Sequence, residues 1–211
     1  MLRIITMRYG DEYDKWYEDN FVHMINKYSN LKYDELFVLE DIDPNFANDK
    51  TKMFNKLSLF KKFKDGCINM CFDIDTIIKG DLNKFVTDEF TMCDAKAWQH
   101  PDYYSKYGLA SDVLTWSDDM SFIYDDFVKN LDYNLENGDE GTDAWFKQYK
   151  PKTFDTKLYT SIRCKTNYDD YPIVFFNGHK DTMLKKGWWH EYTLPQKDWW
   201  DNHKLKNRFQ K

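Results

Sequence analysis

Short apolar segments alternate with segments of helical periodicity along the first seventy residues of the chain. Leu2–Met7, Glu35–Leu39 and Ile68–Phe72 have the length and composition of buried strands. Between them, residues 14–28 and 52–63 carry apolar side chains at helical spacing. Because strands that alternate with helices build βαβ units, the pattern predicts an α/β fold. We expect a single Rossmann-like domain with a mixed, mostly parallel central sheet flanked by helices.

Beyond residue 85 the pattern of apolar residues is mixed. Strands are expected at 89–93, 112–116 and 173–176, and helices at 120–131 and 145–149. The sequence contains no internal repeat, low-complexity tract or linker rich in proline and glycine. We therefore expect one domain over residues 1–190, followed by a basic and aromatic tail at 191–211.

The composition excludes several classes of protein. Hydrophobic residues make up 42% of the 211 residues and aromatic residues 18%, which is typical of a folded domain rather than a disordered chain. The net charge of −6 argues against nucleic acid as a partner, because phosphate binding needs a basic face. The N-terminus lacks the apolar core of a signal peptide, and no apolar run approaches the roughly 20 residues of a membrane span. The four cysteines form no CxxC pair, which indicates reduced thiols and a cytoplasmic protein.

Asp73 and Asp75 directly follow the predicted strand Ile68–Phe72. In open α/β sheets, ligands bind beyond the carboxyl ends of the strands, where this pair lies together with Tyr9 of the first strand–helix turn. Carboxylates two residues apart point to the same side, and their oxygens suit Mg²⁺ or Mn²⁺, which also takes phosphate oxygens. The alternative is a solvated turn, in which Asp73 caps the backbone and Asp75 is exposed.

Residues 72–82 resemble the D-x-D region of nucleotide-sugar glycosyltransferases with the GT-A fold, especially glycosyltransferase family 8 and its relatives. Other stretches resemble family motifs in the same order along the chain. They are the first strand and nucleotide loop at 4–13, the Lys-Leu helix at 55–60, the acceptor-side strand at 110–113, the Gly-Asp-Gln motif at 138–140, a short basic stretch at 159–163 and the late metal-binding motif at 174–180.

The resemblance implies a metal-dependent enzyme that moves a sugar from a nucleotide-sugar, with a UDP-sugar favoured, to a glycan, protein or lipid acceptor. It implies Mn²⁺ or Mg²⁺ as cofactor and, weakly, retention of the anomeric configuration. Asp139 would face the donor sugar as the catalytic residue, a role for which Asp143 competes. The remaining implied roles are donor binding by Tyr9, Tyr13, Lys56, Asp73 and Lys180, and metal binding by Asp73, Asp75 and His179.

Alternative interpretations exist for two of these residues. Tyr13 could stack on the nucleotide base or pack the first helix onto the sheet. Lys56 lies in an amphipathic segment, where most lysines are solvated, although its place before the D-x-D strand favours a phosphate contact.

The chain departs from the family pattern at two positions. Ala110 stands where relatives have an acceptor-side asparagine, and Asn177 stands where they have the metal-binding histidine. His179 follows two residues later, so the third metal ligand is His179, the amide oxygen of Asn177 or a water.

Two other function classes compete with glycosyl transfer. The segment Asp73-Ile74-Asp75-Thr76 also resembles the D-x-D-x-T motif of haloacid-dehalogenase-type phosphatases, in which Asp73 would be the nucleophile. That motif usually lies near the first strand, whereas here some seventy residues precede it. The third interpretation is a catalytically idle module that binds a sugar or nucleotide.

The C-terminal segment differs in charge from the rest of the chain. Residues 185–211 carry a net charge of +4, which leaves −10 on the other 184 residues. Basic and aromatic residues together favour peripheral contact with an anionic membrane. The alternative, which we favour, is that this tail folds over the acidic body.

Overall fold

The central sheet has six strands in the order β2-β1-β3-β6-β5-β7. The computed structural model describes residues 1–9, 13–48, 50–95, 108–138, 141–162, 164, 167–176 and 187–194. The strands are β1 (Leu2–Met7), β2 (Glu35–Leu39), β3 (Ile68–Phe72), β5 (Thr91–Asp94), β6 (Leu109–Trp116) and β7 (Lys152–Thr153). β1 runs parallel to β2 and β3, and β7 parallel to β5, whereas β6 is antiparallel to both of its neighbours. The predicted mixed α/β architecture is confirmed.

Three further strands form a second sheet in the order β4-β9-β8. They are β4 (Thr76–Ile78), β8 (Tyr159–Ser161) and β9 (Ile173–Phe175), with β9 antiparallel to β4 and parallel to β8. β4 begins directly after Asp75, so the acidic pair is the link between the two sheets.

The inner strands β1 and β3 are buried on both faces, which explains their nearly continuous apolar sequences. In β1, Leu2 and Ile4 belong to one core, whereas Ile5 and Met7 belong to the other. The first core lies between the central sheet, helix α1 (Lys15–Tyr28) and the second sheet. Asp14 begins α1 by accepting a hydrogen bond from the backbone N–H of Trp16 at 2.9 Å.

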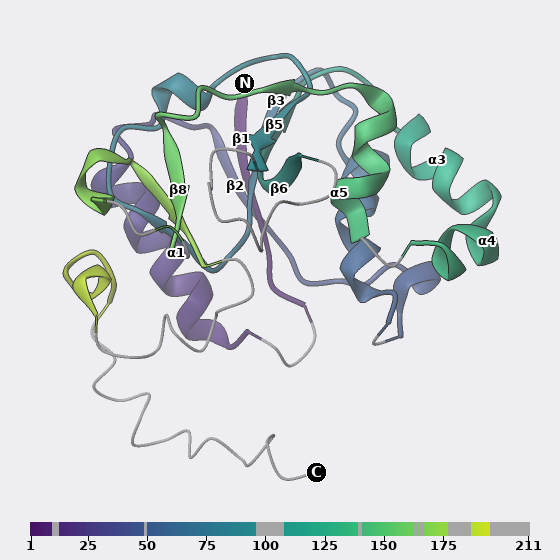
Figure 1. Cartoon of the computed structure of the whole chain (residues 1–211), viewed down its shortest axis with the longest axis horizontal. Helices are drawn as coiled ribbons and strands as arrows, with labels where there is room; N and C mark the ends of the chain where they lie inside the picture. Colours follow the sequence, from purple (N-terminus) through teal and green to yellow (C-terminus); the bar gives the residue numbers. More distant parts are fainter. Residues whose placement is uncertain are drawn as a thin grey trace, which may run out of the picture.

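The second core joins the other face of the sheet to the shorter helices. These are α2 (Ser58–Lys62), α3 (Phe122–Lys129), α4 (Leu131–Glu136) and α5 (Gly141–Phe146). Figure 1 shows α1 and β8 on one side of the central strands, and α3, α4 and α5 on the other side. Tightly packed rings fill this core, among them Phe60, Trp116 and Phe146.

The prediction of one helix over residues 52–63 is wrong. The segment is a 3-10 helix, η2 (Lys52–Leu57), followed by α2. The side chain of Asn55 is fully buried, accepts from the N–H of Asp43 and donates to the carbonyl of Asp41. The hydroxyl of Ser58 donates to the carbonyl of Asn55 at 2.6 Å. Such side-chain bonds to the backbone compete with the backbone hydrogen bonds of a regular α-helix.

Other predicted boundaries also shift. The expected helix at 120–131 is divided into α3 and α4 at Asn130, whose φ of −127° and ψ of 49° interrupt the helix. The expected helix at 145–149 begins earlier, as α5, and ends in the 3-10 turn η6 (Lys147–Tyr149). β6 begins three residues before the predicted 112, because it pairs along its length with β3 and β5.

All four cysteines lie within the described ranges and are free thiols, as the spacing predicts. In the same ranges no helix is both long and apolar enough to cross a membrane. The predicted tail at 191–211 falls outside the described residues from position 195 onward, so its placement stays a prediction.

Candidate functional site

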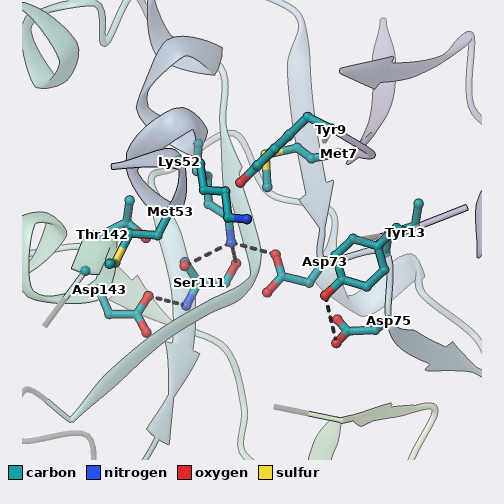
Figure 2. A pocket seen from close by; sticks show the side chains of 13 residues that line it. Met7, Tyr9, Tyr13, Lys52, Met53, Asp73, Asp75, Ser111, Thr142 and Asp143 are labelled. Atoms are coloured by element: carbon teal, nitrogen blue, oxygen red, sulfur yellow. Dashed lines mark hydrogen bonds and ion pairs between the residues drawn. The ribbon is translucent and has the colours of Figure 1, made fainter. Parts of the chain in front are cut away.

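A cavity of about 410 Å³ lies at the carboxyl ends of β1 and β3. This volume lies within the range of roughly 300–1,000 Å³ that small-molecule pockets occupy. β1 and β3 are parallel and in register at Thr6 and Phe72, so the residues that follow each strand emerge at the same edge. β6 runs the opposite way, which brings its first residues to that edge as well. Figure 2 shows the lining side chains, which are Met7, Tyr9, Tyr13, Lys52, Met53, Lys56, Asp73, Ile74, Asp75, Ser111, Gly141, Thr142 and Asp143.

The structure brings together most of the predicted site residues that it describes. Tyr9, Tyr13, Lys56, Asp73 and Asp75 all line this one cavity. Since they come from three separate parts of the chain, their meeting supports the interpretation of the motifs as one site.

Lys56 joins the D-x-D strand to β6. Its ammonium group donates to Asp73 Oδ1 at 2.6 Å, to the carbonyl oxygen of Ser111 at 2.8 Å and to Ser111 Oγ at 3.0 Å. Only 7% of the Lys56 side chain is exposed. Burial alone would lower the pKa of Lys56, but the negative charges of Asp73 and Asp143 outweigh that effect and raise the pKa above its usual value. Lys56 is therefore a buried cation rather than a solvated surface lysine.

Asp75 is a nearly buried carboxylate that faces the same cavity. It is 7% exposed, and its Oδ2 accepts from the hydroxyl of Tyr13 at 3.3 Å. Burial, together with the nearby charge of Asp73, raises the pKa of Asp75 to about 6. The alternative of an exposed, solvated Asp75 is therefore excluded.

Two further acidic side chains, those of Asp143 and Asp112, lie close enough to Asp73 to interact with its charge. Asp143 Oδ1 accepts from the backbone N–H of Ser111 at 2.9 Å. Burial raises the pKa of Asp143, against the opposing effects of Lys56 and of the Ser111 hydrogen bonds. Asp112 is 8% exposed, and burial and the charges of Asp73 and Asp143 raise its pKa well above the usual value. Such clustering of acids with shifted pKa values is typical of functional sites.

The carboxylates of Asp73 and Asp75 fit a divalent cation. Both are hard oxygen ligands, and Asp75 is held in a buried position that favours a nearby positive charge. Among the described residues, no group of three histidine, cysteine or acidic side chains gathers as a metal site.

Several predicted site residues lie outside the described residues. They are Asp139, the candidate for the sugar-facing carboxylate; Lys180, predicted at the phosphates; and His179 and Asn177, the candidates for the third metal ligand. Their roles stay predictions. Asp143, the competitor of Asp139, is described and lines the cavity.

Sequence reasoning missed part of the cavity wall. The resemblance at 110–113 predicts no role for Ser111, although this residue bonds both Lys56 and Asp143. Lys52 precedes Lys56 by four residues, and this spacing of two lysines was a usable signal. Met7, Met53 and Thr142 carry no sequence pattern that marks them.

Known structures share the fold at low sequence identity. No protein-family model and no curated protein matches the chain. The structure of the glycosyltransferase GlyE in Streptococcus pneumoniae TIGR4 matches with a TM-score of 0.62 and 12% identity over 92% of this chain. This chain spans 61% of the GlyE chain.

Two other solved structures match over nearly their whole length. The galactosyltransferase LgtC, in complex with donor and acceptor sugar analogs, matches with a TM-score of 0.62 and 14% identity, covering 94% of this chain and 99% of that chain. A glycosyltransferase involved in the glycosylation of the major capsid of PBCV-1 matches with a TM-score of 0.55 and 10% identity, covering 87% and 99%. The sheet order, the flanking helices and these likenesses together show that the chain has the GT-A glycosyltransferase fold.

Proposed function

We propose that this protein is a metal-dependent glycosyltransferase that uses a nucleotide-sugar, with a UDP-sugar favoured, as donor. The observation that carries the proposal is the pair Asp73 and Asp75 in a cavity at the carboxyl ends of parallel strands, with a buried lysine bonded to the first of them. The structural neighbours are glycosyltransferases, and one of them, LgtC, is known in complex with donor and acceptor sugar analogs.

The cavity offers different chemistry along its length. Tyr9 and Tyr13 lie at one end, where aromatic rings suit the nucleoside. Thr142 and Asp143 lie at the other end and suit the hydroxyl groups of a sugar. The diphosphate then lies between them, next to Asp73 and the lysines of η2.

Glycosyl transfer breaks the bond between the anomeric carbon and the diphosphate oxygen and forms a bond from that carbon to an acceptor hydroxyl oxygen. A Mn²⁺ or Mg²⁺ ion held by Asp73 and Asp75, with His179 or Asn177 as the proposed third ligand, would stabilise the negative charge on the departing diphosphate. Lys56 holds Asp73 in place for this role. The sugar-facing carboxylate is Asp143 or Asp139, and the proposed acceptor is a glycan, protein or lipid.

The fold favours glycosyl transfer over the phosphatase interpretation of Asp73. A catalytically idle binding module is the remaining competitor, and it would bind the nucleotide without turnover. Incubation of the full chain with nucleotide-sugars and Mn²⁺, followed by measurement of released UDP or GDP, separates the two.

The donor site is tested by the variant Asp75→Asn, which removes one charge and keeps the shape of the side chain. UDP and GDP are titrated into both proteins by calorimetry with and without Mn²⁺. We expect wild-type binding to require Mn²⁺ and Asp75→Asn to weaken it by about tenfold or more, because a charged ligand of a buried cation contributes roughly 1.5–3 kcal/mol. Asp118→Asn, at an exposed position, is the matched control and should bind as the wild type does. Equal affinity in Asp75→Asn and wild type would contradict the metal-ligand assignment.

A further inference from the structure

Lys56 uses its whole hydrogen-bonding capacity within the protein. A lysine ammonium group carries three N–H donors. In this structure three acceptors surround it at 2.6–3.0 Å, one from Asp73 and two from Ser111. Lys56 therefore reaches a phosphate oxygen only by giving up one of these bonds. Its geometry fits a group that fastens Asp73 to β6.

Lys52 lies at the start of the same 3-10 helix and lines the same cavity. Its side chain is partly buried, whereas that of Lys56 is buried. In Figure 2 the Lys52 side chain points into the middle of the cavity, toward the region between Tyr9 and Asp73. Both lysines of η2 thus line the cavity, and Lys56 is the more deeply buried of the two.

The place toward which Lys52 points is the place where a diphosphate would lie; this step rests on the proposed function. A nucleoside at Tyr9 and Tyr13 and a sugar at Asp143 leave the diphosphate between them. The surrounding wall is acidic, because Asp73, Asp75 and Asp143 all line it and Lys56 is paired with the first of these. A diphosphate entering this cavity needs positive charge beyond that of Lys56.

We propose that Lys52 binds the diphosphate of the donor, and that Lys56 is a positioning residue that holds Asp73. A lysine binds phosphate as a compact point charge, which suits an approach from one side of the cavity. As negative charge grows on the departing diphosphate, Lys52 stabilises it next to the metal position. The inference replaces Lys56 with Lys52 as the cation that contacts the donor phosphates.

The test compares Lys52→Met and Lys52→Arg with the full-length wild type. UDP and GDP are titrated by calorimetry at saturating Mn²⁺, and Mn²⁺ alone is titrated into each protein. We expect Lys52→Met to weaken binding of the nucleoside diphosphate by about tenfold or more, and Lys52→Arg by about threefold at most. Affinity for Mn²⁺ alone should not fall in either variant, since Lys52 is not a metal ligand. Lys50→Met, at an exposed position two residues away, is the control for loss of a lysine charge and should bind as the wild type does.

Three outcomes decide against the inference. If Lys52→Met binds the nucleoside diphosphates as tightly as the wild type, Lys52 has no phosphate role, while the proposed function stands. If Lys52→Met loses affinity for Mn²⁺ in step with nucleotide, or its unfolding midpoint falls, Lys52 acts through the metal site or the fold. If the wild type binds neither UDP nor GDP with Mn²⁺, the proposed function and this inference both fail.

Discussion

Ser111 connects the two halves of the cavity wall. Its carbonyl and hydroxyl oxygens accept from Lys56, and its backbone N–H donates to Asp143. Ser111 is 5% exposed, so these bonds form largely away from water, where an unpaired polar group costs about 1–3 kcal/mol. One residue at the start of β6 thus fixes a cation on one side and a carboxylate on the other.

Kinetics of two variants can decide whether Asp143 or Asp139 is the carboxylate that faces the sugar. Asp143→Asn keeps an oxygen that can accept from the Ser111 N–H but loses the charge. If Asp143 faces the sugar, the turnover number should fall by at least about tenfold, equivalent to about 1.4 kcal/mol in the barrier. Nucleotide affinity should hardly change, because the proposed place of the nucleoside, at Tyr9 and Tyr13, is at the other end of the cavity. Steady-state kinetics on the preferred nucleotide-sugar, with Asp139→Asn in parallel, shows which carboxylate is needed; full activity in Asp143→Asn assigns the role elsewhere.

At the scale of elements, a buried amide fastens η2 to the turn after β2. The Asn55 side chain accepts from the N–H of Asp43 at 2.9 Å and donates to the carbonyl of Asp41 at 3.0 Å. These two bonds fasten the turn after β2 to the helix that carries both cavity lysines. The position of the lysines is therefore set partly by a residue that does not line the cavity.

The variant Asn55→Ala should lower the free energy of unfolding by about 1–3 kcal/mol, because it removes a fully buried side chain together with its two hydrogen bonds to the backbone of Asp41 and Asp43. Urea unfolding followed by tryptophan fluorescence measures the change. Asn26→Ala, at an exposed position on α1, is the control; it loses only a solvent-exposed hydrogen bond from the Tyr33 hydroxyl and should stay within about 0.5 kcal/mol of the wild type. A loss in Asn55→Ala no larger than in the control would show that water replaces both bonds.

The elements that the sequence predicted correctly are those with strong hydrophobic patterns. β1, β2 and β3 have the predicted bounds, because their apolar runs pack against the two cores, fully in β1 and nearly so in β3, and partly in β2. β4 was missed because its three residues follow Asp75 directly, and only pairing with β9 makes them a strand. The Lys56–Ser111 bonds could not be predicted either, since they join η2 to β6 across 55 positions and depend on tertiary packing rather than on any local pattern.

At the scale of the whole molecule, the basic tail is the least constrained prediction. Residues 185–211, which include this tail, carry a charge of +4 against −10 on the rest of the chain, and we expect the tail to fold over the body. Removal of residues 195–211 should then lower the unfolding midpoint, by about 2–4 °C for each kcal/mol of lost contact, or reduce turnover on a soluble acceptor. Differential scanning fluorimetry and kinetics measure both.

The membrane interpretation of the tail predicts a different pair of results. The full chain would pellet with vesicles of anionic lipid, less so as salt is raised, because salt screens surface charge. Removal of the tail would abolish pelleting and leave stability and turnover on a soluble acceptor unchanged. That combination would contradict a tail folded over the body.

The hydrogen bonds around the cavity join residues that are far apart in the sequence. Tyr13 and Asp75 are separated by 62 positions, Lys56 and Ser111 by 55, and Ser111 and Asp143 by 32. Closing such long loops is slow compared with forming a helix, so these bonds complete only after β1, β3 and β6 have assembled. A ligand whose site needs all of these bonds binds only the native state. Such binding stabilises the native state by mass action and shifts the folding equilibrium toward it. Binding of a nucleotide would therefore show that a newly made chain has assembled β1, β3 and β6 and completed the cavity.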